Sequence, residues 1–249
     1  QRAEAHLQRR FGPFDLIHAH DWLVGNTGIA LKHALQRPLV TTIHATERGR
    51  QQGHIGGDHS AQIDRLERLL TSESRRVIAC SNYMANEIHG YFDTPREKID
   101  VIPNGVAVRP NPFADDQERR VFRRRFAHDD QLMVYYVGRI VYEKGLHVLL
   151  QAWMQVLAQL PRARLVIAGT GAYLGDLRKR AWELGISGSV VFTGYITDEE
   201  RDRLYHATDA AVFPSLYEPF GIVALEAMAA RCPVIVAQTG GLSEVVALH

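Results

Sequence analysis

Short apolar runs rich in Val and Ile recur along this chain of 249 residues, and longer segments with helical periodicity separate them. Such runs are typical of strands buried on both faces of a sheet. They lie at residues 16–20, 39–44, 77–80, 99–103, 132–137, 163–168, 190–194, 210–214 and 233–237. The alternation predicts an α/β fold of parallel sheets with helices on both faces.

Helix boundaries can be read from capping residues between these runs. The clearest helical segments are 144–160, 174–184 and 198–207. Thr197 opens the third of them with a capping-box sequence, Thr-Asp-Glu-Glu, and Ser81 is expected to cap the helix that follows run 77–80.

The regular alternation breaks between residues 106 and 130, where Pro110 and Pro112 precede an acidic stretch and five arginines. We place a domain junction there, with one Rossmann-like domain at 1–109 and another at 110–249. We expect the first to be incomplete, because no strand with a Gly-rich turn precedes Phe14, and the second to lack its C-terminal end.

The arginine-rich segment 119–125 allows two interpretations. With Val121, Phe122 and Phe126 it could make weak peripheral contact with an anionic membrane. Alternatively it is the solvated face of a helix, paired with nearby acidic residues at 115, 116 and 118.

Composition narrows the classes of partner. A formal net charge of +1 gives no overall attraction for nucleic acid, so an anion must be bound by a local cluster. No apolar run approaches the roughly 20 residues that span a bilayer, and no signal-peptide core is seen. The two cysteines, Cys80 and Cys232, favour reduced thiols and a cytoplasmic location.

An acidic motif between residues 215 and 228 is the strongest indication of function. Glu218 lies in a loop containing Pro219 and Gly221, and Glu226 lies about two turns into the helix expected to follow. The first amides of that helix, from Gly221 and Ile222, suit a phosphate, while carboxylates accept hydrogen bonds from paired sugar hydroxyls. The motif therefore suggests a nucleotide sugar, unless Glu226 is only a helix-surface charge.

Two basic residues follow run 132–137. Arg139 and Lys144 lie in a loop at the carboxyl end of a parallel strand, where ligands of open α/β sheets bind, and together could hold a diphosphate. The alternative is an ordinary salt bridge of Lys144 with Glu143 or another acid. Two further loops could line the same pocket or be simple turns: Gly169-Thr170-Gly171 and Gly194-Tyr195-Ile196.

Histidines mark the ends of the first two runs. His18 and His20 should lie on one face of their strand, so a metal site with Asp21 and His44 is considered. Neither a helical two-histidine zinc motif nor a paired-cysteine motif is present, and satisfied core histidines are the alternative.

Six segments in this order resemble the retaining family-4 glycosyltransferases, which include bacterial glycogen synthases and sucrose synthases. They are His20-Asp21-Trp22, Thr42-Ile43-His44, residues 101–106, Val137-Gly138-Arg139 with Lys144-Gly145, Ala168-Gly169-Thr170-Gly171, and residues 214–221 through Glu226. The resemblance implies two Rossmann-like domains in the GT-B arrangement, with no metal and no cofactor beyond a nucleoside diphosphate sugar as donor substrate.

The same resemblance implies residue roles. Arg139 and Lys144 would hold the donor diphosphate, assisted by the amides of Gly221 and Ile222. Glu226 would bind the donor ribose, and Glu218 the hydroxyls of the transferred sugar. His44 and Asp21 would position sugar and acceptor. The remaining donor-binding residues would be Gly169, Thr170, Gly171, Tyr195, Ile196 and Phe220.

The sequence therefore predicts a metal-independent retaining glycosyltransferase that transfers a sugar to a carbohydrate or another hydroxyl acceptor. Residues 46–50 (Thr-Glu-Arg-Gly-Arg) resemble branches of the family that act on α-glucans. The alternatives are a nucleotide-sugar epimerase of the same fold, a non-catalytic nucleotide-sugar-binding fragment, and a histidine-metal hydrolase. The family's N-terminal Gly-rich loop and C-terminal helix are absent from the sequence, which leaves open whether this chain alone is active.

Overall fold

The computed structural model describes residues 10, 12 and 14–246, and the chain divides into two compact units, 1–103 and 104–249. Every apolar run expected to be a strand forms one. Both sheets are entirely parallel, and each strand ladder joins elements that a helical segment separates in the chain. The predicted α/β class with two Rossmann-like domains is confirmed.

The first unit is a four-stranded sheet in the order β1-β2-β3-β4, with the residues of neighbouring strands paired in register from Ile17 opposite Leu39. Buried aliphatic side chains such as Leu39, Ile43 and Val77 form its centre. Its strands are β1 (Ile17–His20), β2 (Leu39–Ile43), β3 (Arg76–Ala79) and β4 (Ile99–Val101); its helices are α2 (Gly25–Leu35), α3 (Glu47–Arg50), α4 (Asp58–Glu73) and α5 (Asn82–Phe92), with short 3-10 turns η1 (Trp22–Val24) and η2 (Arg96–Lys98).

The second unit is a five-stranded sheet in the order β7-β6-β5-β8-β9. Its strands are β5 (Met133–Val137), β6 (Arg164–Ala168), β7 (Val190–Gly194), β8 (Ala210–Phe213) and β9 (Val234–Val236). Its helices are α6 (Asp116–Arg123), α7 (Leu146–Gln159), α8 (Leu174–Glu183), α9 (Asp198–Ala207), α10 (Ile222–Ala229) and α11 (Leu242–Val245), with 3-10 turns η3 (Tyr142–Lys144) and η4 (Ser187–Ser189).

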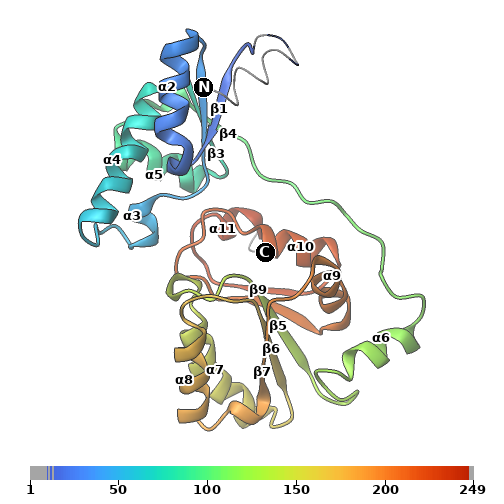
Figure 1. Ribbon diagram of the computed structural model, residues 1–249. Helices are drawn as coiled ribbons and strands as arrows, with labels where there is room; N and C mark the ends of the chain where they lie inside the picture. Colours follow the sequence, from blue (N-terminus) through green and yellow to red (C-terminus); the bar gives the residue numbers. More distant parts are fainter. Residues whose placement is uncertain (1–9, 11, 13, 247–249) are drawn as a thin grey trace. The chain divides into compact units, whose positions relative to one another are not determined.

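The strand order of the second sheet creates a switch point. From β5 the chain proceeds outward through β6 to β7, and then returns to place β8 on the other side of β5. Because crossovers are right-handed, α7 and α8 lie on one face of the sheet and α9 and α10 on the other (Figure 1). The loops after β5 and β8 therefore flank the crevice where ligands of such sheets bind.

The predicted caps are confirmed. The Ser81 hydroxyl accepts a hydrogen bond from the Met84 amide at 3.1 Å, and Thr197 accepts one from the Glu200 amide at 3.2 Å. The helix expected from residue 144 begins at Leu146 instead, because Gly145 takes a left-handed conformation at φ 68° and separates η3 from α7.

The arginine-rich segment is paired with acids. Arg119 and Arg120 both contact Asp116, whereas Arg123 is buried and donates to the carbonyls of Ala207 and Gln131, at 2.6 Å each. Further carboxylate partners are Asp209 for Arg123, Asp129 for Arg124 and Glu200 for Arg125. The expected pairing is thus found for Arg119 and Arg120 through Asp116, whereas the other three arginines pair with acids other than those expected and Arg123 is a buried anchor. Contact of this segment with a membrane stays a prediction.

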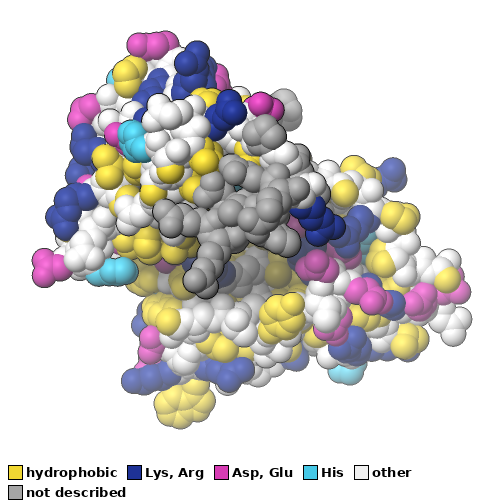
Figure 2. All heavy atoms as spheres, turned by 45° about the horizontal axis from the view of Figure 1, so that its top comes forward, with side chains coloured by type: hydrophobic (Ala, Val, Ile, Leu, Met, Phe, Trp, Pro, Cys, Tyr) yellow, Lys and Arg dark blue, Asp and Glu magenta, His cyan; other side chains and the backbone are white. Residues whose placement is uncertain are grey.

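The surface agrees with a near-neutral chain. Figure 2 shows basic and acidic side chains interspersed over the visible face, without a broad area of one sign. Cys80 and Cys232 are both buried free thiols. No helix in the described part of the chain has the length and apolar character needed to cross a bilayer.

Candidate active site

The loops at the carboxyl edge of the second sheet are joined by backbone hydrogen bonds. These bonds connect the loop after β5 to the loops after β6 and β8, and the loop after β6 to the end of β7. They run from the amide of Ile140 to the carbonyl of Thr170 (2.9 Å), Tyr173 to Ile140 (3.1 Å), Gly169 to Gly194 (2.7 Å) and Leu216 to Glu143 (2.8 Å). Three loops and the end of β7 therefore form one continuous rim.

Glycine is required where these loops touch. A Cβ on Gly145 would lie 2.0 Å from the carbonyl oxygen of Pro214, and one on Gly169 would lie 1.9 Å from that of Gly138. Both residues also have positive φ, 68° and 131°. We expected Gly169 and its neighbours to allow a ligand to approach the backbone. The structure shows that these glycines allow one loop to approach another.

Lys144 and Glu218 meet at the switch point. Lys144 Nζ lies 2.6 Å from Glu218 Oε2, and the two side chains are only 17% and 11% exposed. The Ser215 hydroxyl donates to the same oxygen at 3.2 Å. The acid that pairs with Lys144 is therefore Glu218 from the loop after β8, and no ion pair between Lys144 and Glu143 is found among the described residues. A cation and a carboxylate thus share one partly enclosed position.

Arg139 is less constrained. Its side chain is 69% exposed, and its carboxylate partner in the described structure is Glu143, at 3.8 Å. The hydroxyl of Tyr136 donates to the Arg139 carbonyl at 3.1 Å, so the backbone at this position is held while the guanidinium is not. In the described part of the chain no ion pair or side-chain hydrogen bond joins Arg139 to Glu218, and the diphosphate role of Arg139 stays a prediction.

The start of α10 has free backbone donors. Gly221 precedes the helix at φ 102°, and no side chain caps it. Among the described residues, no hydrogen bond engages the amides of Gly221 and Ile222. Phe220 is buried, at 7% exposed, next to this turn. Free amides at a helix N-terminus can receive an anion, as expected for this motif.

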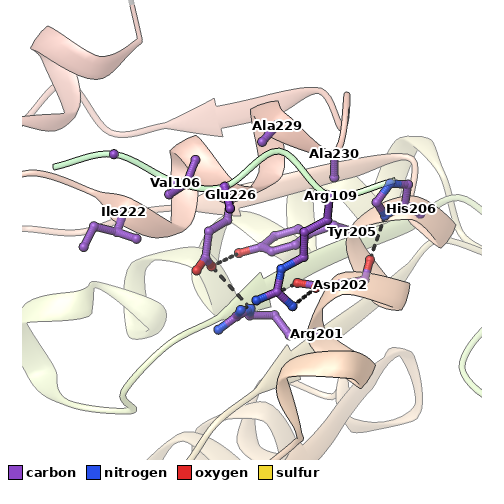
Figure 3. A pocket seen from close by; sticks show the side chains of 12 residues that line it. Val106, Arg109, Arg201, Asp202, Tyr205, His206, Ile222, Glu226, Ala229 and Ala230 are labelled. Carbon is purple, nitrogen blue, oxygen red and sulfur yellow. Dashed lines mark hydrogen bonds and ion pairs between the residues drawn. The ribbon is translucent and has the colours of Figure 1, made fainter. Parts of the chain in front are cut away.

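Glu226 lines a pocket of about 200 Å³ between α9, α10 and the segment around Val106 (Figure 3). Its Oε2 accepts a hydrogen bond from the Tyr205 hydroxyl at 3.3 Å and lies 3.4 Å from Arg201 Nε. On the segment after β4, Arg109 pairs with Asp202 of α9 at 2.5 Å. Glu226 is therefore not a plain helix-surface charge.

Several opposing causes act on the pKa of Glu226. Burial raises the pKa of the Glu226 carboxyl, whereas the positive charge of Arg201 and the hydrogen bond from Tyr205 lower it. Desolvation is the larger cause, so the pKa lies above its ordinary value.

The residues expected to face the base differ in exposure. Tyr195 is 79% exposed, whereas Ile196 packs against the core of the second unit. Thr170 and Gly171 lie in the rim described above, where Thr170 contributes its carbonyl to Ile140. These positions are at the same sheet edge as Lys144, and their ligand contacts stay predictions.

In the first unit, the expected histidines gather at the ends of β1 and β2. His20 Nδ1 and His44 Nε2 are 2.9 Å apart, and the His44 amide donates to Asp21 Oδ1 at 2.7 Å. His18 and His20 lie on one face, with ring centroids 4.3 Å apart, and His18 Nε2 bonds Thr42 Oγ1. Burial, helped by the charges of His20 and His44, lowers the pKa of His18.

The backbone of Asp21 is strained. Its φ is 58°, an unfavourable value for a residue other than glycine, and such strain is concentrated at functional sites. Within residues 10, 12 and 14–246, no group of three or more His, Cys, Asp or Glu side chains is placed to hold a metal ion. The ends of β1 and β2 thus present imidazoles and a carboxylate without metal-site geometry.

Sequence reasoning missed the neighbours of the two glutamates. Arg201 and Tyr205 are four residues apart on α9 and so share a helix face, a spacing visible in the sequence. Their contact with Glu226, however, depends on how α9 packs against α10. No sequence pattern around Ser215 or Arg109 indicated that these residues contact the site.

Two parallel α/β domains, one with a partly enclosed ion pair at the switch point of its sheet, define a protein of the Rossmann-like class. The chain belongs to the glycosyltransferase family: the model described as "Glycosyl transferases group 1" matches residues 118–249, and "Glycosyltransferase Family 4" matches residues 1–109. An uncharacterized glycosyltransferase of Methanocaldococcus jannaschii is 41% identical over 239 residues, covering 94% of this chain and 60% of that protein. A glycogen synthase of Mycobacterium tuberculosis is 40% identical over 232 residues, covering 93% and 54%. The chain thus spans between half and two thirds of the length of these relatives.

Solved structures agree on the fold. The sucrose-phosphate synthase of Thermosynechococcus elongatus superposes with a TM-score of 0.80 at 27% identity, covering 98% of this chain and 61% of that one. The Anabaena protein HepE, solved with UDP and glucose, gives a TM-score of 0.81 at 23% identity and covers 98% and 64%.

Proposed function

We propose that the protein is a retaining glycosyltransferase, which transfers a sugar from a nucleoside diphosphate donor to a hydroxyl of an acceptor. The observation that carries the proposal is the Lys144–Glu218 pair at the switch point, with Nζ and Oε2 2.6 Å apart. A diphosphate needs a cation, and a sugar ring needs an acceptor of hydroxyl hydrogen bonds. This pair offers both within one partly enclosed position.

Donor binding would exchange the partners of this pair. Lys144 would turn to a phosphate oxygen, with Arg139 and the amides of Gly221 and Ile222 as further donors. Glu218 would then accept hydrogen bonds from hydroxyls of the transferred sugar. Two observations on the described residues support this arrangement: no hydrogen bond engages the two amides at the start of α10, and the guanidinium of Arg139 is exposed, with Glu143 3.8 Å away.

The transfer step follows from these roles. The bond between the anomeric carbon and the phosphate oxygen breaks while a bond to the acceptor oxygen forms on the same face, so the configuration is retained. The acceptor proton passes to the departing phosphate oxygen. The protein would supply neither nucleophile nor base, and its main contribution would be fixed positive charge where the diphosphate becomes more negative.

The rest of the donor would lie along the same edge of the sheet. Glu226 would bind the ribose hydroxyls, and the backbone around Thr170, Gly171, Tyr195 and Ile196 would face the base. Related proteins support a nucleotide sugar: HepE was solved with UDP-glucose, and starch synthase IV of Arabidopsis thaliana with ADP and acarbose.

In the first unit, His44 and Asp21 are the candidates for contacting the sugar and the acceptor. An α-glucan is the acceptor favoured here, because the glycogen synthase of Mycobacterium tuberculosis is 40% identical. We also propose that the reaction needs no metal and no further cofactor, and that it takes place in the cytoplasm.

A transfer assay tests the proposal. The purified protein is incubated with UDP-, ADP- or GDP-glucose, first alone and then with maltohexaose. Transferase activity predicts a longer oligosaccharide with a new α-linkage by NMR, formed only with acceptor present. Conversion of the donor sugar without acceptor would indicate an epimerase instead. Donor binding without either product would indicate a binding protein.

A further inference from the structure

We infer that Arg201 is a positioning residue for the nucleotide site, because it holds the Glu226 carboxylate in place to bind the donor ribose. The inference rests on the proposed role of Glu226. Arg201 itself is not expected to touch the donor.

The geometry around Glu226 separates its two oxygens. Oε2 is the oxygen near both Arg201 Nε, at 3.4 Å, and the Tyr205 hydroxyl, at 3.3 Å. In the described residues, no hydrogen bond engages Oε1. One oxygen is thus anchored against α9, and the other stays available to a ligand in the pocket that Glu226 lines (Figure 3).

Tyr205 alone cannot fix the carboxylate. Its hydroxyl has a single proton, and the carbonyl of Val223 competes for it at 3.1 Å. Arg201 carries a permanent charge, and its guanidinium is itself braced by Asp198 at 3.1 Å and Asp202 at 3.6 Å. Its contact with Glu226 is an ion pair and not a hydrogen bond, since Nε has no hydrogen-bond partner in the described structure.

The electrostatic surroundings make this cation important. Burial raises the pKa of Glu226, and Arg201 is the largest cause that lowers it. A protonated carboxyl accepts fewer hydroxyl hydrogen bonds than a carboxylate. The other titratable or charged groups around the pocket are Asp198, Asp202, Tyr205 and His206 of α9, and Arg109.

A ligand lacking one hydroxyl isolates the role. The dissociation constants of UDP and 2′-deoxy-UDP, and of ADP and 2′-deoxy-ADP, are measured by calorimetry. For whichever base the wild-type protein binds, the ribonucleotide should bind roughly tenfold more tightly than the 2′-deoxyribonucleotide. This ratio corresponds to the loss of one charge-assisted hydrogen bond. Arg201→Met should weaken binding of the ribonucleotide by about tenfold and binding of the deoxynucleotide by less than about threefold.

Arg203 provides the matched control. It lies on the same helix, its side chain is also 22% exposed, and it pairs with Glu118 at 2.6 Å and not with Glu226. Arg203→Met should leave the preference unchanged. Arg201→Lys, which keeps the charge, should restore part of the preference and decides the matter if Arg201→Met does not fold.

A pH series supplies a second readout. The ratio of the two dissociation constants cancels the titration of the phosphates, which both ligands share. In the wild type the preference should fall as the pH decreases and Glu226 gains a proton. In Arg201→Met this fall should occur at higher pH, because the cation that lowers the pKa is gone.

The outcomes separate two failures. If Arg201→Met weakens the binding of both nucleotides equally, or of neither, the positioning role of Arg201 is wrong. The proposed binding of ribose by Glu226 then still stands. If the wild type shows no preference and Glu226→Gln changes nothing, or if no nucleotide binds, the proposed donor site itself is wrong and the inference falls with it.

Discussion

Lys144 Nζ and Glu218 Oε2 are 2.6 Å apart although their residues are 74 positions apart in the chain. Lys144 follows β5 and Glu218 follows β8, and these strands are neighbours in the sheet. Each side chain thus satisfies the charge of the other. Under the proposed function, a bound donor replaces this ion pair with two contacts, one from Lys144 to phosphate and one from Glu218 to the sugar.

Removal of the ammonium should therefore mainly affect the chemical step. We expect Lys144→Ala to lower turnover by roughly 10²–10³ through loss of positive charge at the departing diphosphate. The measurement is kcat with a saturating nucleotide sugar, together with the melting temperature. Lys179→Ala is the control, because Lys179 is exposed on α8 and pairs with Glu183 at 3.7 Å. A folded Lys144→Ala protein with the wild-type rate would refute the assignment.

Neutralising the carboxylate should separate binding from turnover. In Glu218→Gln, Lys144 loses its ionised partner and becomes available to phosphate, so free UDP or ADP should bind as tightly as before or up to about tenfold tighter. Turnover should fall by at least about tenfold, because the sugar hydroxyls lose a charged acceptor. Calorimetry and initial rates on the same preparation check both. Nucleotide binding that weakens along with turnover would contradict the exchange of partners.

The unfolding free energy should depend on pH through Glu67 of α4. Its side chain is 1% exposed, and burial raises its pKa to about 8, opposed by the Glu47 amide and by Arg50. The pKa of Glu67 is higher in the folded protein than in the unfolded protein. Its contribution to the unfolding free energy is therefore fully present at pH values below the unfolded pKa. The contribution is lost as the pH rises toward 8, by about 4 kcal/mol. Urea unfolding should thus show stability falling from pH 5 to 8.

Glu67→Gln tests that assignment directly. Its stability should depend less on pH over the same range, whereas Glu183→Gln on the exposed face of α8 should keep the wild-type slope. An unchanged slope in Glu67→Gln would mean that other groups cause the dependence.

Contact between loops should make one glycine irreplaceable. We expect Gly145→Ala to lower the unfolding free energy by at least about 2 kcal/mol, because φ is 68° and the added Cβ would lie 2.0 Å from the Pro214 carbonyl oxygen. Gly90→Ala is the matched control: Gly90 lies in α5 with nothing within 4 Å of an added Cβ, so a gain of about 0.5 kcal/mol is expected. Equal effects at the two positions would contradict this account.

Much of the fold could be predicted because its signals are local. Each strand is a Val- and Ile-rich run, and Ser81 and Thr197 cap helices with their own hydroxyls. The observed ends of helices and strands differ from the predicted ones where the backbone of a single residue sets the boundary. Gly145 separates η3 from α7, and β4 ends at Val101, shortly before Pro103, which has no amide to donate.

The site was predictable only in outline. The motifs indicated that Lys144, Glu218 and Glu226 follow parallel strands, but no local pattern gives the strand order that places β8 beside β5. The partners of Glu226 depend in the same way on the packing of α9 against α10. Arg123 shows the limit most clearly, since its neighbours in sequence indicated a surface charge while its guanidinium is buried against Ala207 and Gln131.

The shared rim of the second sheet has a consequence for engineering. Because the loops after β5, β6 and β8 and the end of β7 are joined by hydrogen bonds, replacing one loop with that of a homologue would leave amides and carbonyls of its neighbour without partners. Attempts to alter the proposed donor preference should therefore graft the loops as a set. Otherwise they should change outward-facing side chains such as Tyr195 and leave the backbone of the rim untouched.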